Sequence, residues 1–490
     1  MNENTPRTFD LWIDGKPQQS QSGDTFERRS PFTGAVVGRY ANAAAEDSQL
    51  AVAAARRAFD SGEWPHSSSR TRHDVLLRVA ALVAEQADEL ADMMVQESGK
   101  PITLARGEVQ VSVRTFEYYA GLALSDEGSA VTDRNQDALG LVIKEPVGVA
   151  GLITAWNFPL LGLVNKAAPA LAAGCTVVAK PSHLCSGPSA RLAALLTEAG
   201  LPAGVFNLVT TDIERGATVG QHLASSLEVD KIAFTGSTES GKAVLRSSAT
   251  NVKRVSLELG GKSANIVFAD ADLEDAARTA ISAFCFNSGQ QCSAGSRLLV
   301  QHEVYEQFIE LVRKNAELQV LGDPSDPATT MGPLISAEQR DRVLGYVDIG
   351  DEEGTLVSGG KDALPENLRE SLFLPPTIFV DVASHARLAQ EEVFGPVLSV
   401  ISFTDEQDAI AIANSSRYGL AGGVWTRDIT RAFRVVKAVR TGKMFVNSYN
   451  TAGIDDMPHG GYKESGFGRE FGTSGLEEFL ELKTVQIRLT

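Results

Sequence analysis

The spacing of hydrophobic and polar residues changes along this chain. In the first part, short strand-like runs such as LWIDGK and SPFTGAVVGRY are broken by glycine and proline. A helical run, SQLAVAAARRAFDSG, follows and stops at Gly62, and residues 69–98 predict one long amphipathic helix that ends at Gly99. A further helix is expected over Glu108–Gly121.

From Leu141 onward, strand patterns and helix patterns alternate. The strand patterns include LVIKEPVGVAGLIT, CTVVAK, VFNLVT, KIAFTGS and VSLEL, with helical runs such as LGLVNKAAPALAAG between them. A second alternating region begins after Gly261 with the strand SANIVF and the helix DLEDAARTAISAFCF. Such alternation predicts an α/β fold with two Rossmann-like open-sheet domains. The tail VQIRLT reads as a strand that either pairs with a neighbouring subunit or closes a sheet.

Composition narrows the classes of partner and compartment. The 490 residues carry a net charge of −17, which disfavours nucleic acid and anionic membrane surfaces as partners. No run of about 18 apolar residues is present, so no membrane span is expected. The four cysteines form no C-x-x-C pair and the first residues have no signal-peptide pattern, so we expect a cytoplasmic protein without a metal site.

One cysteine has unusual surroundings. Cys292 lies in FNSGQQCSAGSR, among small and polar residues that keep a thiol accessible and supply backbone N–H donors. These conditions favour a nucleophile, whereas a bystander thiol is the more common use of a single cysteine. Cys175, in AAGCTVV, fits the bystander interpretation.

Two turns after predicted strands suggest a nucleotide site. In FTGSTESG, residues 234–241, a strand leads through glycine into a helix whose N-terminus can bind phosphate, although an ordinary turn explains it equally well. In VVAKPSH, Lys180 follows a buried strand at the carboxyl end of the sheet, where ligands bind in open α/β folds. The alternative for Lys180 is a solvated surface lysine.

Three further segments carry candidate chemistry. Asn157, in TAWNFPLL, can donate to an oxyanion or simply cap a helix that begins at Pro159. Glu258, in VSLELGGKSA, is a base with a raised pKa if it is buried, or a solvent-facing strand residue. EEVFGPV, residues 391–397, can contact a ribose and a nicotinamide ring, or form a turn.

Together these segments resemble the aldehyde dehydrogenase superfamily over essentially the whole chain. The matching segments, in order, are TAWNFP, KPS, FTGST, LELGGKS, FNSGQQC, EEVFGPV and GGYKESGFGRE. The resemblance implies that Cys292 is the nucleophile, Glu258 the general base, and Asn157 with the Cys292 N–H the oxyanion hole. It also implies a cofactor, NAD or NADP, and the release of a carboxylic acid by hydrolysis of a thioester on Cys292.

The resemblance implies a set of cofactor-binding residues. They are Thr154, Trp156, Lys180, Ser182, His183, Gly236, Ser237, Gly241, Leu259, Glu392 and Phe394. His183 departs from the pattern, because relatives that prefer NAD commonly carry glutamate there. The loss of that carboxylate removes a repulsion from a 2′-phosphate and makes use of NADP plausible, unless His183 points away from the site.

The resemblance also implies a substrate tunnel. Its wall is expected at Val111, Gly162, Asn165, Phe286, Gln291, Gly453 and His459. Several of these residues are small or polar where relatives carry bulky side chains, so we expect a wide tunnel for a bulky or polar aldehyde, such as an aromatic aldehyde, an aminoaldehyde or a semialdehyde.

The family fold implies a division of the chain into three parts. These are a dinucleotide-binding domain (1–124 and 146–257), a catalytic domain (258–464) and a β oligomerisation flap (125–145 and 465–490) of a homotetramer or homodimer. Two other functions stay open: a CoA-acylating relative, against which Glu258 argues, and a non-catalytic binding protein on this fold.

Overall fold

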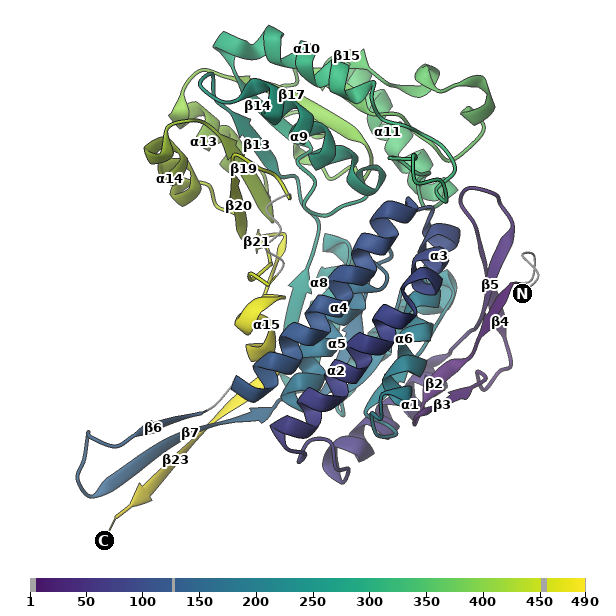
Figure 1. Cartoon of the computed structure of the whole chain (residues 1–490), viewed down its shortest axis with the longest axis vertical. Coiled ribbons are helices and arrows are strands. Elements are labelled where there is room, and N and C mark those ends of the chain that lie inside the picture. Colours follow the sequence, from purple (N-terminus) through teal and green to yellow (C-terminus); the bar gives the residue numbers. More distant parts are fainter. Residues whose placement is uncertain (1–5, 126–127, 451–455, 490) are drawn as a thin grey trace.

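The computed structural model describes residues 6–125, 128–450 and 456–489 and is built around two large sheets (Figure 1). The first is eight-stranded, in the order β22-β12-β11-β8-β9-β10-β2-β3. Its strands are β22 (Gly466–Phe467), β12 (Arg254–Glu258), β11 (Lys231–Thr235), β8 (Val149–Ile153), β9 (Thr176–Lys180), β10 (Phe206–Leu208), β2 (Leu11–Ile13) and β3 (Lys16–Gln18). The strands from β12 to β10 are parallel, and the edges on both sides are antiparallel.

Helices cover both faces of this sheet. Along β9, Val177 and Ala179 pack into one hydrophobic core while Val178 packs into another, as strand alternation requires. The first core holds α2 (Ser69–Glu85), α3 (Ala87–Ser98), α4 (Ile102–Ser125), α5 (Leu161–Ala173) and α6 (Gly187–Glu198). The second holds α1 (Ala45–Asp60) and α7 (Ile213–Ser225), with α8 (Thr238–Ser247) against it.

The second sheet is seven-stranded and is arranged in the same way. Its order is β15 (Thr355–Ser358), β16 (Thr377–Val380), β17 (Val397–Phe403), β14 (Arg297–Gln301), β13 (Ala264–Val267), β19 (Ala421–Trp425) and β20 (Lys443–Val446). One face packs on α9 (Leu273–Cys285) and α10 (Tyr305–Ala316). The other packs on α11 (Ala337–Glu353), α12 (Arg387–Gln390), α13 (Glu406–Asn414) and α14 (Ile429–Ala438). The α/β fold class predicted from the sequence is confirmed.

A three-stranded sheet projects from the body as an arm (Figure 1). It contains β6 (Ser129–Val131), β7 (Ala138–Pro146) and β23 (Leu480–Arg488), and β23 pairs antiparallel with β7 along its whole length. The predicted tail strand therefore pairs within its own chain. Smaller elements complete the fold: β1 (Arg7–Phe9), β4 (Thr25–Arg29) and β5 (Val36–Ala41) form one sheet, β18 (Tyr418–Gly419) pairs with β21 (Tyr462–Lys463), and α15 (Gly472–Glu477) precedes β23.

Two local predictions were wrong. The expected helix over residues 69–98 is two helices, α2 and α3, which are separated at Gln86 and both pack on α4 and α6. Pro159 does not begin a helix, since α5 starts at Leu161. The run LVIKEPVGVAGLIT contains two strands, β7 and β8, which lie in different sheets.

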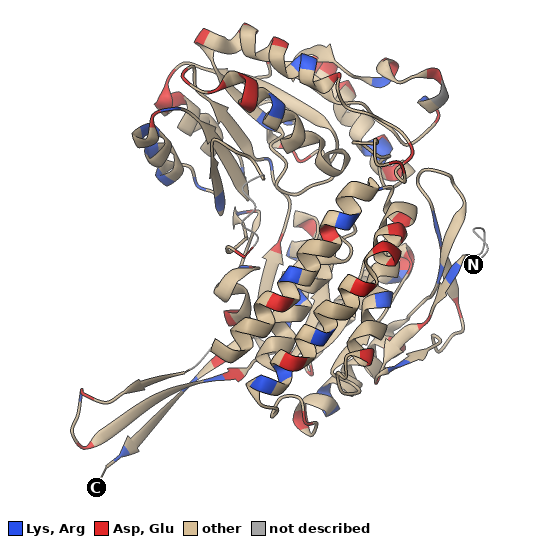
Figure 2. Ribbon diagram, viewed as in Figure 1, with Lys and Arg blue, Asp and Glu red and all other residues tan. Residues whose placement is uncertain are grey.

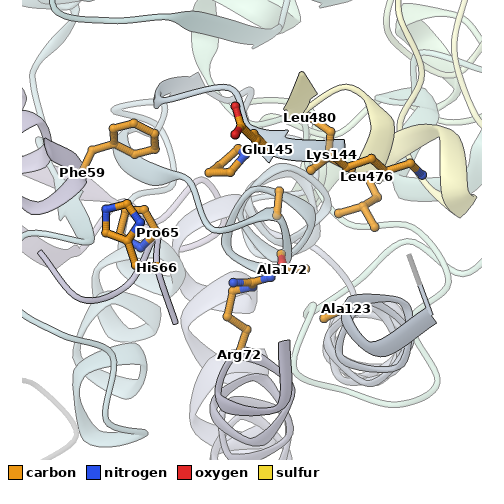
Figure 3. A pocket seen from close by; sticks show the side chains of 12 residues that line it. Phe59, Pro65, His66, Arg72, Ala123, Lys144, Glu145, Ala172, Leu476 and Leu480 are labelled. Atoms are coloured by element: carbon orange, nitrogen blue, oxygen red, sulfur yellow. Dashed lines mark hydrogen bonds between the residues drawn. The ribbon is translucent and has the colours of Figure 1, made fainter. Parts of the chain in front are cut away.

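A surface cavity of about 470 Å³ lies where the arm joins the body (Figure 3). Its lining comes from the end of α1, from α2, α4 and α5, and from the bases of β7 and β23, with the Arg72 side chain directed toward Ala172. No predicted site residue lines it. In Figure 2, acidic and basic residues are interspersed along α2 and α4, whereas the charged residues of α3 are all acidic. Within the described ranges, no helix is both long and apolar enough to cross a bilayer.

Candidate active site

The carboxyl ends of four neighbouring parallel strands carry the predicted residues. The segment Thr154–Asn157 follows β8, Lys180 ends β9, Gly236 follows β11, and Glu258 ends β12. Because β9, β8, β11 and β12 are adjacent, these side chains meet at one edge of the sheet.

The Cys292 segment has an unusual backbone. After α9 ends at Cys285, Asn287 and Ser288 both adopt left-handed conformations, with φ of 52° and 56°. Such residues cost about 1–3 kcal/mol each unless their surroundings hold them. Ser288 Oγ donates to the Gly332 carbonyl at 2.7 Å, and Gln290 Oε1 accepts from the Ile335 N–H at 2.9 Å. The segment is therefore tied to the loop that precedes α11.

Asn157 contacts this segment directly. Its Nδ2 donates to the Gln290 carbonyl at 3.2 Å, two residues before Cys292. Asn157 is buried, and its carbonyl accepts from Asn287 Nδ2 at 3.2 Å. The structure thus joins two of the predicted catalytic segments, although each comes from a different sheet.

Two glycines allow backbone segments to approach closely. A Cβ on Gly261 would lie 2.4 Å from the Cys292 carbonyl oxygen, so the turn after Glu258 packs against the Cys292 backbone. A Cβ on Gly289, where φ is +73°, would lie 2.2 Å from the Gly395 carbonyl carbon. The LELGGKS, FNSGQQC and EEVFGPV segments consequently meet at one place.

Glu258 is buried and lies near two charged residues, Lys166 and Glu470, that are not among the site residues predicted from the sequence. Its Oε2 has no hydrogen-bond partner among the described residues and lies 3.9 Å from His459 Nε2. Lys166 on α5 pairs with Glu470, and both act electrostatically on Glu258. A lysine in the apolar run LVNKAAPALAAG was the available signal for Lys166, and Glu470 is the last residue of GGYKESGFGRE.

Burial sets the protonation of the site. It raises the pKa of Glu258 well above its ordinary value, with a further contribution from the nearby Glu470. It raises the pKa of Glu392 to about 7. The pKa of the Cys292 thiol is raised to about 12 by burial and then by Glu392 and Glu258. In the free protein, the thiol and Glu258 therefore favour their protonated forms.

Most of the predicted cofactor residues lie at the same edge of the first sheet, whereas Glu392 and Phe394 lie on the loop between α12 and β17 of the second sheet. Thr154 Oγ1 is buried without a partner among the described residues, and burial lowers the pKa of Lys180 to about 8. The pKa of His183 is lowered to about 4 by burial and by Lys180, so its ring is neutral at pH 7. A buried hydroxyl and a buried lysine at this edge fit the hydroxyls and phosphates of a dinucleotide.

The phosphate turn and the residues expected at the nicotinamide have defined partners. Gly236 precedes Ser237, which caps α8 by accepting from the Ser240 N–H at 3.1 Å, and Gly241 packs against Leu259. Ser182 Oγ accepts from the Leu184 N–H at 3.3 Å.

Glu392 accepts from the Gly261 N–H at 3.0 Å, next to the Cys292 backbone. Phe394 and Trp156 form an edge-to-face pair with centroids 5.3 Å apart. These contacts place the predicted nicotinamide end beside Cys292.

The predicted tunnel residues are only partly brought together. Phe286 stacks with Phe158, with ring centroids 6.3 Å apart, and Asn165 is buried with no hydrogen-bond partner for its Oδ1 in the part of the chain that the structure describes. A Cβ added at Gly162 would have no heavy atom from elsewhere in the described residues within 4 Å. Val111 and Gln291 are half-buried, on α4 and beside Cys292 respectively. Gly453 lies outside the described residues.

Comparison with known proteins agrees with this geometry. The Aldehyde dehydrogenase family profile matches residues 18–485. The betaine aldehyde dehydrogenase of Bacillus subtilis is 44% identical over 97% of this chain and 96% of its own length. The NADP/NAD-dependent aldehyde dehydrogenase PuuC of Escherichia coli is 42% identical over 98% of this chain and 95% of its own length.

A solved structure extends the comparison. The indole-3-acetaldehyde dehydrogenase AldA of P. syringae, as a cysteine-to-alanine mutant in complex with NAD⁺ and IAA, superposes with a TM-score of 0.96 at 39% identity. The match covers 99% of this chain and 98% of that one.

The chain belongs to the aldehyde dehydrogenase family. It is an oxidoreductase that oxidises aldehydes with NAD(P). The family, the enzyme class and the cofactor class predicted from the sequence are thereby confirmed.

The exposure and the protonation of the thiols generate a prediction. Iodoacetamide should label Cys292 first, because Cys292 is partly exposed whereas Cys175, Cys185 and Cys285 are buried. In the free enzyme the rate should rise about tenfold per pH unit from about pH 7 to 10, because the thiolate fraction grows with pH below the raised pKa. Peptide mass spectrometry measures the site and the rate.

Cys292→Ser is the control for this labelling and should abolish the fast phase. A rate that levels off near about pH 8.5, as for an ordinary thiol, would contradict the raised pKa.

Proposed function

We propose that Cys292 attacks the aldehyde and that Glu258 activates the water that releases the acid. The observation that carries the proposal is the convergence of three separate segments. The Asn157 amide bonds the Gln290 carbonyl, and the carboxylate of Glu258 acts on the pKa of the Cys292 thiol. A nucleophile, a base and an amide donor in one buried place are the parts that acyl transfer needs.

The first step is addition to the aldehyde carbonyl. The Cys292 thiol gives its proton to solvent water, and the thiolate sulfur bonds the carbonyl carbon as the carbonyl π electrons move onto oxygen, which gives a thiohemiacetal anion. Asn157 Nδ2 and the Cys292 N–H are the donors for the oxygen that becomes negative, and one such donor is worth about 3–4 kcal/mol. The amide must release or share its bond to the Gln290 carbonyl to make this contact.

NAD(P), when bound, supplies the oxidant that turns the thiohemiacetal into a thioester. Lys180 and His183 would hold the adenosine ribose, the turn Gly236–Ser237 the pyrophosphate, and Glu392 with Phe394 the nicotinamide end. The remaining residues proposed for this site are Thr154, Trp156, Ser182, Gly241 and Leu259. The position of most of these residues at one edge of the first sheet, and the bond of Glu392 to the Gly261 N–H beside the Cys292 backbone, support this assignment.

Hydrolysis of the thioester then depends on Glu258. Its unpartnered Oε2 is available to a water molecule, and its raised pKa makes it a stronger base once it has lost its proton. The base form becomes more abundant as pH rises, so release of the acid should accelerate with pH. His459, 3.9 Å away, has its pKa lowered to about 4 and stays neutral beside this carboxyl.

For the substrate, we propose a bulky or polar aldehyde, such as an aromatic aldehyde, an aminoaldehyde or a semialdehyde. The open space at Gly162 and the unpartnered amide oxygen of Asn165 support a wide tunnel with a polar wall. The names of two relatives, a betaine aldehyde dehydrogenase and an indole-3-acetaldehyde dehydrogenase, point to substrates of this size. The other proposed wall residues are Val111, Phe286, Gln291, Gly453 and His459.

For assembly, we propose a homodimer or homotetramer, with the arm as the oligomerisation flap. The arm projects away from the body (Figure 1), and most of β23 is exposed. A strand with a free edge outside the body offers backbone groups to a second copy. The domain boundaries predicted from the sequence remain part of this proposal.

The mechanism predicts a burst of NAD(P)H formation that can be separated from the later hydrolysis of the thioester. Glu258→Gln should form about one NAD(P)H per active site, seen at 340 nm, and then turn over about 10²-fold or more slowly, because the thioester forms but is not hydrolysed. Cys292→Ala should form none. Unchanged steady-state turnover in Glu258→Gln would contradict the role of the base, and acyl-CoA formation on addition of CoA would favour the acylating alternative.

The tunnel predicts a substrate order. With wild-type enzyme, kcat/KM should be higher for aromatic aldehydes, aminoaldehydes and semialdehydes than for acetaldehyde and propanal, because a wide tunnel leaves small aldehydes without contacts. Gly162→Leu should narrow the tunnel and lower kcat/KM for the larger substrates about tenfold or more while sparing the short ones. Short alkanals that outperform every larger aldehyde would refute the substrate proposal.

The cofactor pocket predicts a preference switch. His183→Glu should raise KM for NADP about tenfold or more, because a carboxylate repels the 2′-phosphate, and should leave KM for NAD equal or lower. His183→Gln is the control, since it keeps a neutral donor. An unchanged NADP to NAD ratio in His183→Glu would show that this side chain points away from the ribose.

A further inference from the structure

We propose that the buried pair Lys100–Glu108 is a clamp that positions Asn157 against the Cys292 segment. The clamp deepens the proposed function and rests on it, because it acts through the Asn157 amide. Both residues are positioning residues, since neither is placed at the reacting atoms.

The pair is deeply buried between two helices. Lys100 directly follows Gly99, which ends α3 in a left-handed conformation, and Glu108 lies in the second turn of α4. Lys100 Nζ contacts Glu108 Oε2, and the two side chains are only 1% and 2% exposed. Removing two charges from water costs more than their attraction usually returns, so such a pair is a weak source of stability. The hydrogen bonds that Lys100 and Glu108 make are therefore a better guide to their role than their contribution to stability.

The remaining bonds of the pair all go to one turn. Lys100 Nζ donates to the Asn157 carbonyl at 2.8 Å. Glu108 Oε1 accepts from the N–H groups of Leu160 and Leu161, at 3.0 Å each. Helix α5 has no side-chain cap of its own, so Glu108 supplies from α4 the acceptor that its first N–H groups need. The pair therefore holds both ends of residues 157–161.

On its opposite side, the same turn is hydrogen-bonded to the segment that precedes Cys292. The Asn157 carbonyl that accepts from Lys100 also accepts from Asn287 Nδ2, and Asn157 Nδ2 donates to the Gln290 carbonyl. Asn287 Nδ2 lies 3.3 Å from the same Gln290 carbonyl. A continuous set of bonds thus runs from Lys100 through Asn157 to the strained segment just before Cys292.

An aromatic contact follows the same path. Lys100 Nζ lies 4.5 Å from the centroid of the Phe158 ring, and Phe158 stacks on Phe286, one of the proposed tunnel residues. A cation over a ring face is attractive and fixes the ring position. Lys100 therefore contacts both residues at the start of the turn, Asn157 and Phe158.

The clamp has a specific kinetic consequence. An oxyanion donor works only when it is held in the geometry of the transition state, and a displacement of about 1 Å can cost about 10²-fold in rate. Loss of the clamp should slow thiohemiacetal and thioester formation while KM for the cofactor changes little. Hydrolysis by Glu258 should be affected less than the burst.

The test uses Lys100→Met together with Glu108→Gln in the full-length enzyme. Glu108→Gln keeps an acceptor for the N–H groups of Leu160 and Leu161, and Lys100→Met removes the charge, so the lost contacts are those of Nζ. At saturating cofactor and aldehyde, the stopped-flow burst at 340 nm should slow about 10²-fold, while the thermal midpoint stays close to wild type.

A double-mutant cycle with Asn157→Ala separates positioning from general damage. If the clamp acts through the Asn157 amide, Lys100→Met with Glu108→Gln should lower the burst rate only about twofold or less in an Asn157→Ala background. The reason is that the effects of coupled residues are not additive. If the fold-losses in burst rate from the clamp variant and from Asn157→Ala multiply in the combined variant, the proposal is overturned. An Asn157→Ala enzyme with a normal burst would overturn the proposed oxyanion role itself, so the two failures are distinguishable.

The chain contains a matched control pair. Lys231 Nζ contacts Glu478 Oε2 at 2.7 Å and lies 5.1 Å from the centroid of the Phe479 ring, at the start of β11 rather than at its carboxyl end. The Lys231 side chain is fully buried, and the Glu478 side chain is 25% exposed. Lys231→Met with Glu478→Gln should leave the burst rate within about twofold. An equal slowing in both pairs would show a general effect of buried charge and overturn the proposal.

A milder variant keeps the proposal testable if Lys100→Met with Glu108→Gln does not fold. Glu108→Asp keeps the charge but withdraws the carboxylate by one methylene, so the burst should slow about tenfold in a folded enzyme. A wild-type burst in Glu108→Asp and in a folded clamp variant would also overturn the proposal.

Discussion

The candidate site depends on backbone segments that touch with no side chain between them. The Gly261 position and the Cys292 carbonyl leave no room for a Cβ, and neither do Gly289 and Gly395. The first contact joins the end of a strand in one sheet to a loop of the other sheet, and the second joins two loops of the seven-stranded sheet. Because backbone positions are fixed by whole sheets, the distance between Glu258 and Cys292 follows from the packing of the two domains and not from the local sequence.

Burial at this junction determines the charge of the site. The pKa values of Glu258, Glu392 and Cys292 are all raised. Although the chain has a net charge of −17, the acidic groups of the candidate site therefore favour their protonated forms. Several acidic groups that share a dry space cannot all ionise. An oxidised nicotinamide carries a positive charge, and a site of this kind is stabilised by receiving one. With the nicotinamide in the proposed place, cofactor binding and activation of the thiol would be electrostatically linked.

Much of this organisation could be predicted from the sequence, and the missed part has a common cause. Strand and helix alternation indicated the α/β class, and the order of short motifs indicated Cys292 and Glu258. The break at Gln86 was missed because no glycine or proline marks it. Lys166 and the Lys100–Glu108 pair were missed because their partners are distant in sequence, so only the folded chain shows what they hold.

The turn that carries Asn157 shows why local signals are insufficient. Its helix lacks a cap of its own and takes one from α4, and its carbonyl is bonded by a lysine from the α3–α4 connection. The facing segment contains two left-handed residues, Asn287 and Ser288. Ser288 is bonded to Gly332, and Gln290 of the same segment is bonded to Ile335, both beyond α10. Neither segment satisfies its own backbone, and each costs free energy without the other's surroundings. The reactive geometry therefore forms only when both sheets, with their helices, are in place, and a change far from Cys292 in sequence can alter its chemistry without touching it.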